Sequence, residues 1–438
     1  MKRFVGLDGI KGLALIAIVL YHCMQQRLPG GFYGVDVFFT VSGFLIAVSL
    51  IRSLAETGSL NLVRYIPKRA VRLYPALFLL IPVIVSVGWL FDHDILVSIR
   101  DQVITVLLGC FSKSAQLPFH LWLPNAMNAP TPVSAFLHSA TMVKAGVFLM
   151  ARLWPVLSGT DEWFWIVSSA GAATLLLGGY VALFQNDLKG LLAYSTVSHL
   201  GLITFLVGLG SPLAAVAAVF HVLNHATFKA SLFMIAGIVD HETHSRDMRK
   251  LGGLWALMPW TATLSMVAAA SMAGVPLTNG FLSKEMFFTE AVVGTTGVWA
   301  WLVPAAVTLA GICSVAYSLR FVHDTYFNGP LGDVPNTHPH EPPLGMKLPA
   351  MLLVAMCIAV GLLPAITFGP LVDVAATALA GKPLPAYHLA IWHGFNLPLL
   401  MSAIALVAGV GLYLLLAADK RLHRIESEAW FGAATGRQ

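Results

Sequence analysis

The chain has 438 residues, of which 57% are hydrophobic and 11% are charged, and its formal net charge is +5. An average soluble domain carries roughly 25% charged residues, so this composition excludes a soluble fold. The basic residues gather in short segments between apolar runs, which indicates membrane topology and not nucleic-acid binding.

Apolar runs follow one another along nearly the whole chain. A helix needs about 20 apolar residues to cross a bilayer, so we predict an all-α polytopic bundle of about 11 or 12 transmembrane helices. A sheet is excluded, because its open edges would leave backbone groups unpaired in lipid. The runs cover residues 10–24, 35–51, 73–91, 95–112, 133–156, 165–184, 190–209, 212–239, 254–273, 281–293, 299–319, 348–368 and 397–417.

The segments outside these runs define the expected topology. The first run resembles a signal peptide, but no small-residue cleavage site follows, so we predict a retained helix. Two basic loops are expected in the cytoplasm by the positive-inside rule. They contain Arg52, Arg64, Lys68, Arg69 and Arg72, and Arg246, Arg249 and Lys250.

Two further polar segments lie near the C-terminus. Residues 329–349 are rich in proline and glycine and are predicted to form a loop outside the membrane. His338 and His340 in this loop either hold a metal or are simply solvated. Residues 420–438 are polar and amphipathic, as expected of a surface helix or of the start of a longer segment. The four cysteines are isolated, so neither a disulfide framework nor a thiolate metal site is predicted.

Two segments interrupt the helical pattern, and each has a lysine beside it. The first, CFSKSAQLPFHLWLPNAMNAPTPV, contains four prolines, and the second, SMAGVPLTNGFLSKEMFF, contains Gly274, Pro276 and Gly280. Paired broken helices at membrane depth are typical of a transport path. The alternative for the first segment is a simple loop between two spans.

Ionisable side chains recur within the apolar runs. A lysine at the bilayer centre costs about 2.5 to 3.5 kcal/mol, so such residues are rare and usually functional. A small rearrangement can load or unload the proton of a buried amine, as a proton relay requires. The candidates are Lys113, His138, Lys144, His199, His221, His225, Lys229, Lys284 and Glu285.

The sharpest pattern is FHVLNHATFKASLF, in which His221, His225 and Lys229 recur every four residues. Four residues advance about 6 Å along a helix and about 40° around it, which predicts a column bridged by hydrogen bonds or single waters. Histidine can accept a proton on one ring nitrogen and donate from the other. No metal site is predicted, because Lys229 would repel a cation and the glutamate of the HExxH motif is missing. Alternatively, these side chains only bond neighbouring helices.

Two other sets of polar residues have the same two interpretations. His138 and Lys144 are six residues apart and would need separate partners on one helix. Ser195, Thr196, Ser198 and His199 give their run a polar stripe. Each set could hold water or protons, or could only hold the helix bundle together.

Several long motifs carry a resemblance to a known family. KSAQLPFHLWLPNAMNAPTPVSAFLHSATMVKAG, NDLKGLLAYSTVSHLG, HVLNHATFKASLFMIAGIVDHET and TNGFLSKEMFF resemble the proton-translocation module of complex I antiporter-like subunits and Mrp-type antiporters. The stretches TMVKAG, GIVDHET and IWHGFNLPLLMS favour the large A-type component of the Mrp antiporters. The similarity covers residues 105–418.

The resemblance implies an inverted-repeat fold with two half-channels on broken helices, joined by a polar axis in mid-membrane. By motif, Lys113 belongs to the first broken helix, His138 and Lys144 to the helix after it, and Lys284 to the second broken helix. His221, His225 and Lys229 form the connecting relay. The implied partners are other subunits of a membrane assembly, protons and the candidate coupling ion sodium. The implied location is a bacterial inner membrane, and no cofactor is expected.

The sequence also departs from this family. The family's module begins with further helices, one of which brings a glutamate that pairs with the lysine matching Lys113. In their place, LDGIKGLALIAIVLYHC, GGFYGVDVFFTVSGFLI and IPKRAVRLYPALFLL resemble the start of acyltransferase family 3. That family implies His22 as general base, Lys11 eleven positions before it, and Asp36 with Arg69 or Arg72 as supporting groups.

We therefore expect three regions and keep three functions open. Residues 1–104 form a partial acyltransferase-like membrane segment, residues 105–418 the antiporter-like module, and residues 419–438 a polar tail. Proton translocation by cation/proton antiport is favoured, because the antiporter-like motifs cover most of the chain. The alternatives are a membrane O-acyltransferase that acts on surface glycans, and a chimera in which neither part works.

Overall fold

The computed structural model describes residues 103–128, 131–332, 334–336, 338–392 and 394–418. All described residues belong to one compact unit. The described part is helical, apart from one isolated bridge between Asp187 and Asp247. This confirms the predicted all-α class.

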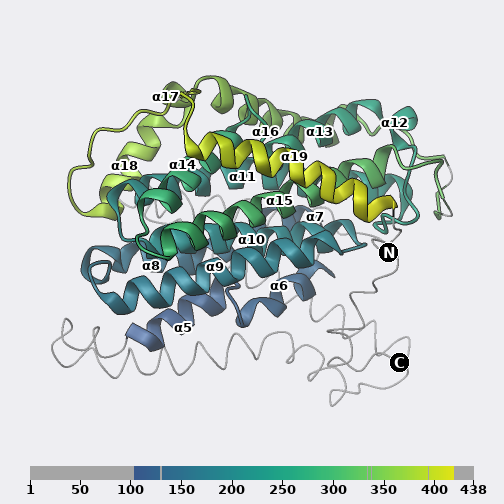
Figure 1. Ribbon diagram of the computed structural model, residues 1–438. Coiled ribbons are helices and arrows are strands. Elements are labelled where there is room, and N and C mark those ends of the chain that lie inside the picture. The colour runs from purple at the N-terminus through teal and green to yellow at the C-terminus, as the bar shows by residue number, and fades with distance from the viewer. Residues whose placement is uncertain (1–102, 129–130, 333, 337, 393, 419–438) are drawn as a thin grey trace, which may run out of the picture. The chain divides into compact units, whose positions relative to one another are not determined.

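The helices are labelled in Figure 1. In chain order they are α5 (Val103–Lys113), η2 (Phe119–Leu121), α6 (Trp122–Asn125), η3 (Ala126–Asn128), α7 (Thr131–Ser139), η4 (Met142–Lys144), α8 (Ala145–Leu157), α9 (Asp161–Leu183), α10 (Leu188–Gly208), α11 (Pro212–Thr243), α12 (Leu254–Leu257), α13 (Pro259–Ala273), α14 (Asn279–Val293), α15 (Trp299–Tyr326), α16 (Leu344–Leu362), α17 (Pro364–Thr367), α18 (Gly369–Ala380) and α19 (Leu397–Ala418).

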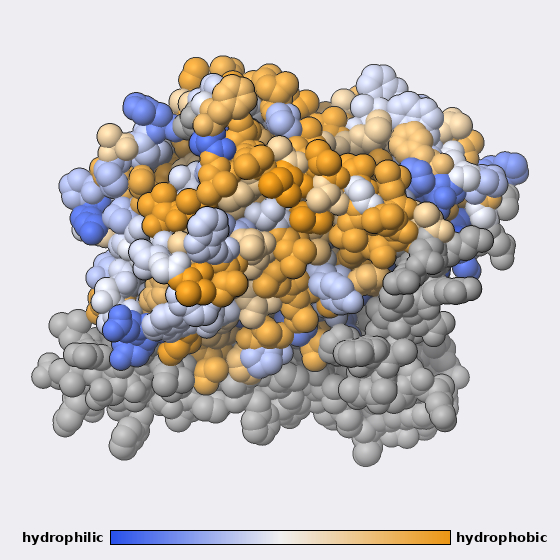
Figure 2. Space-filling view, viewed as in Figure 1, coloured by the Kyte–Doolittle hydropathy of each residue, from blue (hydrophilic) through white to orange (hydrophobic). Residues whose placement is uncertain are grey.

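Seven helical stretches in the described part are long and apolar enough to cross a membrane. They are α7 to α8 taken together, α9, α10, α11, α15, α16 and α19. Figure 2 shows apolar side chains over the middle of the viewed face and polar ones gathered toward the two ends of the helices. This banding fits a bilayer around the bundle, with water at its two faces.

The helix α10 lies in the interior, where it has almost no exposed surface. It packs closely along α9, and the two run side by side in Figure 1. Glycines allow this approach: a Cβ added at Gly171 would lie 2.3 Å from the backbone nitrogen of Phe205, and one at Gly201 would lie 2.4 Å from that of Leu175. The polar residues of α10 therefore face protein and not lipid.

The 32-residue helix α11 is the other central element. It begins with Ser211 as N-cap, whose hydroxyl accepts from the Ala214 backbone at 2.9 Å, followed by Pro212 at the first turn. It contacts α7, α10, α13, α14, α16 and α18. Polar side chains on several sides of α11 are therefore buried against protein.

Both predicted breaks are present. After α5 the chain turns, and the Ser114 hydroxyl accepts from the Val147 backbone of α8 at 2.9 Å. The second break separates α13 from α14, and Gly274 ends α13 with φ +84°. Asn279 at the start of α14 donates to the Thr227 hydroxyl of α11 at 2.8 Å. Side-chain bonds to neighbouring helices thus hold each break in place.

Several predicted boundaries differ from those of the observed helices. The run 133–156 was expected to be one helix, but α7 ends at Ser139 and α8 begins at Ala145. The backbone of Thr141 leaves the helical region, with φ −123° and ψ −83°. The loop expected over 329–349 ends earlier, because α16 begins at Leu344.

Candidate proton-relay site

A pair of histidines lies at the centre of the described bundle. His199 Nδ1 on α10 lies 3.0 Å from His221 Nε2 on α11, and the two rings are stacked. The other nitrogen of His221 lies 3.0 Å from the Ser283 hydroxyl on α14, and His199 Nε2 lies 3.4 Å from the Tyr317 hydroxyl on α15. These contacts join four helices in one hydrogen-bonded row.

The orientation of this row has a simple consequence. If Tyr317 donates to His199, then His199 donates to His221, and His221 donates to Ser283, because each neutral imidazole has one donor and one acceptor. Reversing every bond gives the opposite orientation. The row can therefore pass a proton from end to end and be reset by tautomer exchange.

His225 is fully buried on the next turn of α11. Its ring centre lies 5.3 Å from that of His199 and 6.3 Å from that of His221. Neither of its ring nitrogens forms a hydrogen bond with His199, His221 or Lys229. The expected column of His221, His225 and Lys229 is therefore not directly hydrogen-bonded. His199 of α10 lies beside the imidazoles of His221 and His225.

Lys229 completes the α11 series and is fully buried. Its Nζ donates to the Ser195 hydroxyl of α10 at 2.7 Å and contacts Met272 Sδ of α13 at 3.2 Å. The stripe that contains Ser195 and His199 thus serves both the amine and the imidazoles of α11.

Lys284 lies across the second break. An ammonium has three N–H donors, and three oxygens lie 2.8 Å from its Nζ: the carbonyls of Met272 and Ala273 and the hydroxyl of Ser314. The two carbonyls belong to the last turn of α13, whose C-terminal end carries partial negative charge. The amine of α14 therefore reaches back and caps the preceding half-helix.

A small cavity adjoins this amine. Its volume is about 20 Å³, enough for one water. Its polar lining comes from Ser198, His199, Lys284, Ser314 and Tyr317. A single occupant there could connect the imidazole row with the amine of Lys284.

Lys144 and His138 lie on opposite sides of the break after α7. Lys144 donates to the Val222 carbonyl of α11 at 2.9 Å, one turn before His225. His138 packs on Phe233 with ring centres 6.0 Å apart, and its Nδ1 has no described partner. Lys144 therefore contacts α11 close to His225. His138 of α7 instead contacts α11 at Phe233, about two turns beyond His225.

The remaining predicted residues are not part of this cluster. Lys113, at the end of α5, is half-buried and forms no ion pair with a described residue. His340 lies 2.6 Å from the Glu242 carboxylate, His338 is exposed, and the described residues contain no His, Cys, Asp or Glu group that could hold a metal. The residues of the acyl-transfer alternative lie outside the described residues, as does the tail 420–438: Lys11, His22, Asp36, Arg69 and Arg72.

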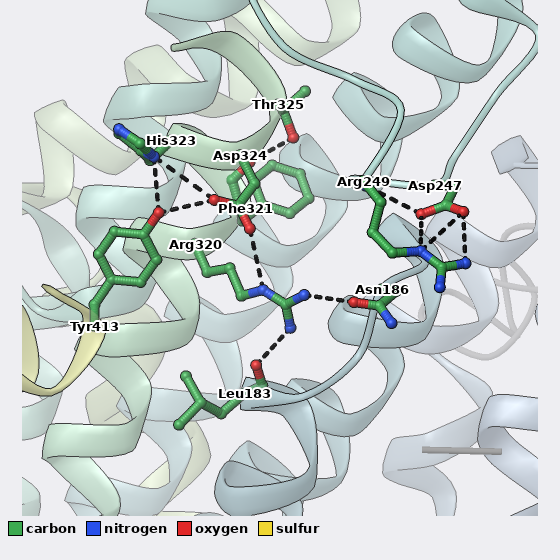
Figure 3. Close-up of polar contacts among 10 residues, drawn as sticks. All are labelled: Leu183, Asn186, Asp247, Arg249, Arg320, Phe321, His323, Asp324, Thr325 and Tyr413. Carbon is green, nitrogen blue, oxygen red and sulfur yellow. Dashed lines mark hydrogen bonds and ion pairs between the residues drawn. The ribbon is translucent and has the colours of Figure 1, made fainter. Parts of the chain in front are cut away.

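A buried arginine network was not predicted from the sequence. Arg320 of α15 is fully buried, and Figure 3 shows its guanidinium between three groups. It pairs with Asp324 at 3.2 Å, one turn later, and donates to the Leu183 carbonyl and the Asn186 side chain at 2.6 Å each. The arginine thus ties α15 to the turn between α9 and α10.

The same network reaches α19. Tyr413 donates to Asp324 at 2.8 Å and lies 2.7 Å from His323 Nδ1. Nearby in Figure 3, Asp247 pairs with Arg249 at 2.8 Å in a loop outside the helices. Partial burial raises the pKa of the Asp247 carboxyl, but the Arg249 guanidinium outweighs this effect and holds the pKa below its ordinary value.

The sequence offered little sign of the serine, tyrosine and methionine residues that complete the site. Ser283 directly precedes Lys284, which is the one local signal. Ser314 and Tyr317 are three residues apart on α15 and therefore share a face. Met272 is one apolar residue among many in its run.

The described architecture is that of a polytopic membrane protein with the broken-helix fold of secondary transporters. Residues 93–312, half of the chain, match the family described as NADH:quinone oxidoreductase/Mrp antiporter, TM. The chain belongs to this family.

Individual relatives agree with this assignment. The chain is 61% identical over 315 residues to the A/B component of a probable K⁺/H⁺ antiporter of Rhizobium meliloti, covering 72% of this chain and 31% of the relative. It is 48% identical over 339 residues to the A component of the Na⁺/H⁺ antiporter of Alkalihalophilus pseudofirmus, covering 72% and 42%. The chain therefore spans less than half the length of these relatives.

Two solved structures share the fold. A chain in the Mrp complex from Dietzia sp. matches with a TM-score of 0.71 and 34% identity, over 90% of this chain and 44% of that one. A chain of an archaeal membrane-bound sulfane sulfur reductase matches with a TM-score of 0.60 and 23% identity, over 80% and 71%. The second likeness concerns the fold alone.

Proposed function

We propose that this chain moves protons across a membrane, in exchange for a cation, as an antiporter-like component of a larger assembly. The observation that carries the proposal is the hydrogen-bonded row from Tyr317 through His199 and His221 to Ser283, next to Lys284. Ionisable residues buried in the membrane are costly and are usually functional, which favours a relay over simple helix packing.

The contacts between the buried ionisable residues suggest an order for the proton path. Lys144 contacts the turn of α11 that leads to His225, and His225 lies beside the paired imidazoles of His199 and His221. From His199, one water in the adjoining cavity would reach Lys284. Each of these side chains can both accept and donate a proton, and the steps that have no direct hydrogen bond require a bridging water or a movement of the side chain.

Charge repulsion limits how many protons the path holds. Lys229 and Lys284 both reach Met272, one at its sulfur and one at its carbonyl. Two positive charges so close inside protein repel each other strongly. Protonation of one amine therefore favours release from the other, which moves a proton along the path.

The relatives support an alkali cation as the exchanged ion and a membrane assembly as the context of the exchange. Their names specify K⁺/H⁺ or Na⁺/H⁺ antiport and a component of a multisubunit system. We extend to this chain an alkali cation as the exchanged ion and further membrane proteins as partners. The implied location is the bacterial cell membrane.

The test is proton flux in inverted vesicles that contain the full chain in its native membrane assembly. We expect Lys229→Ala to reduce cation-driven proton flux by roughly 100-fold, because the amine between Ser195 and Met272 is lost. Lys382→Ala is the matched control, since this lysine is exposed after α18. Equal flux in both variants, at equal protein levels, would refute the proposal.

For residues 1–104 the resemblance to acyltransferase family 3 stays a prediction. It rests on three motifs that follow one another in the order found in that family, and on the spacing of Lys11 and His22 within the first. Transfer of acyl groups to a surface glycan that is lost in His22→Ala would establish it. Glycan acylation that continues unchanged in this variant would reject it.

A further inference from the structure

The cavity beside Lys284 lies next to an unusual concentration of oxygen atoms. The Met272 and Ala273 carbonyls and the Ser314 hydroxyl surround the ammonium at 2.8 Å. The hydroxyls of Ser198 and Tyr317 belong to residues that line the cavity itself. Carbonyl and hydroxyl oxygens at the C-terminal end of a half-helix are the ligands that alkali cations use inside membranes.

Lys284 already places a positive charge at these oxygens. Its flexible stem lies over Gly274, where a Cβ would come within 2.7 Å of Lys284 Cδ. A neutral amine has one donor fewer and cannot satisfy all three oxygens in the same way. Loss of the proton would therefore leave carbonyl oxygens without a positive partner in a buried site.

We propose that the end of α13, Ser314 and the adjoining cavity form a binding site for a dehydrated alkali cation, Na⁺ or K⁺, which competes with the proton on Lys284. This inference rests on the proposed function and deepens it, since it names the place where the cation is exchanged. One proton leaves Lys284 as one cation binds, so the charge of the site is conserved. Competition at a single site makes the exchange one for one.

The ionisable groups around this site also bear on its charge. Lys229 Nζ contacts Met272 Sδ at 3.2 Å, so a cation on the Met272 carbonyl would repel a proton on Lys229. Glu285 follows Lys284 on α14 and is buried. Of the ionisable described residues, His199 on α10 and Tyr317 on α15 line the cavity, and Lys229 on α11 contacts Met272. His221 on α11 lies 3.0 Å from the hydroxyl of Ser283, the residue before Lys284.

Equilibrium binding of radioactive ²²Na⁺ and ⁸⁶Rb⁺, the latter as a K⁺ analogue, tests the site on the purified full assembly in detergent. For the unmodified protein we expect affinity to rise about tenfold per pH unit while Lys284 is mostly protonated, and to level off once Lys284 is mostly neutral. Lys284→Gln should bind the cation with an affinity that no longer follows pH. Ser314→Ala should weaken binding about tenfold and keep the pH dependence, because one oxygen ligand is lost.

Ser318→Ala is the matched control. Ser318 is buried one turn further along α15, and its hydroxyl donates to the Ser314 carbonyl at 2.7 Å, outside the cavity lining. The proposal is overturned if neither ion binds, if Lys284→Gln keeps the pH dependence, or if Ser314→Ala equals Ser318→Ala. Binding is measured without a gradient, so loss of cation binding with intact proton flux would reject this site alone. Normal binding with flux that is insensitive to Lys229→Ala would reject the proposed function alone.

Discussion

The two broken helices have the same local design and different surroundings. In both, a lysine stands at the break. Lys113 at the end of α5 is half-buried and forms no ion pair with a described residue, whereas Lys284 is 7% exposed and donates to three oxygens. From this difference we expect the second break to contribute more to proton transfer than the first.

Position along the break explains the contrast. Lys113 is the last residue of the first half-helix, so its stem starts at the break. Lys284 lies on the second half-helix and reaches back across the break to the carbonyls of the first. Only the second geometry lets the amine neutralise the negative end of a half-helix inside the bundle.

The largest effect is expected from the arginine that anchors α15, the helix that supplies Ser314 and Tyr317 to the second break. Arg320→Met would leave Asp324 buried without its cation and should destabilise the protein by about 3–5 kcal/mol. Thermal unfolding in detergent measures this loss.

Arg249→Met is the control for that variant. Its pair with Asp247 is more exposed, with 43% of the arginine side chain accessible. We expect a change of about 0–1 kcal/mol. Similar losses in the two variants would contradict the role of Arg320 as a buried anchor.

The next largest effect is expected for a substitution of Gly274 beside the second break. Gly274→Ala would put a Cβ 2.7 Å from Lys284 Cδ at a backbone φ of +84°. Displacing the amine should reduce proton flux roughly tenfold to 100-fold in inverted vesicles.

Gly297→Ala separates displacement from backbone strain. Gly297 also has a positive φ, +62°, but no atom lies within 4 Å of an added Cβ. We expect flux close to that of the unmodified protein. If Gly297→Ala lost as much flux as Gly274→Ala, strain alone would account for both.

The smallest effect is expected at the first break, where a non-glycine residue has a positive φ. Ala115, with φ +49°, is fully buried. In Ala115→Gly, relief of about 1 kcal/mol of backbone strain would offset about 0.8 kcal/mol from the lost methyl group. Flux and melting temperature should barely change, and a flux loss like that of Gly274→Ala would show that the first break is equally critical.

Much of the fold could be predicted from the sequence. The apolar runs indicated the spanning helices, and proline, glycine and lysine marked both breaks. The interruption between Ser139 and Ala145 was missed, because no proline or glycine stands between these residues. The predicted run ended at residue 319, because Arg320 is charged. The helix α15 nevertheless continues to Tyr326, since Asp324 pairs with Arg320 one turn later.

The site was predictable only in part. The four-residue spacing identified His221, His225 and Lys229 as one series on α11. The spacing could not show that His199 hydrogen-bonds to His221, because the two residues lie on different helices. For the same reason it could not show that the amines of Lys229 and Lys284 both contact Met272. Periodicity describes one helix, and a relay is built between several.

The role of the second break is tested by comparing proton flux between Lys284→Ala and Lys113→Ala in the same vesicles and at equal protein levels. We expect roughly 100-fold loss for Lys284→Ala, because the capped amine at the second break is removed. Lys113→Ala should keep most of the flux. Equal losses, or a larger loss for Lys113→Ala, would contradict a relay centred on the second broken helix.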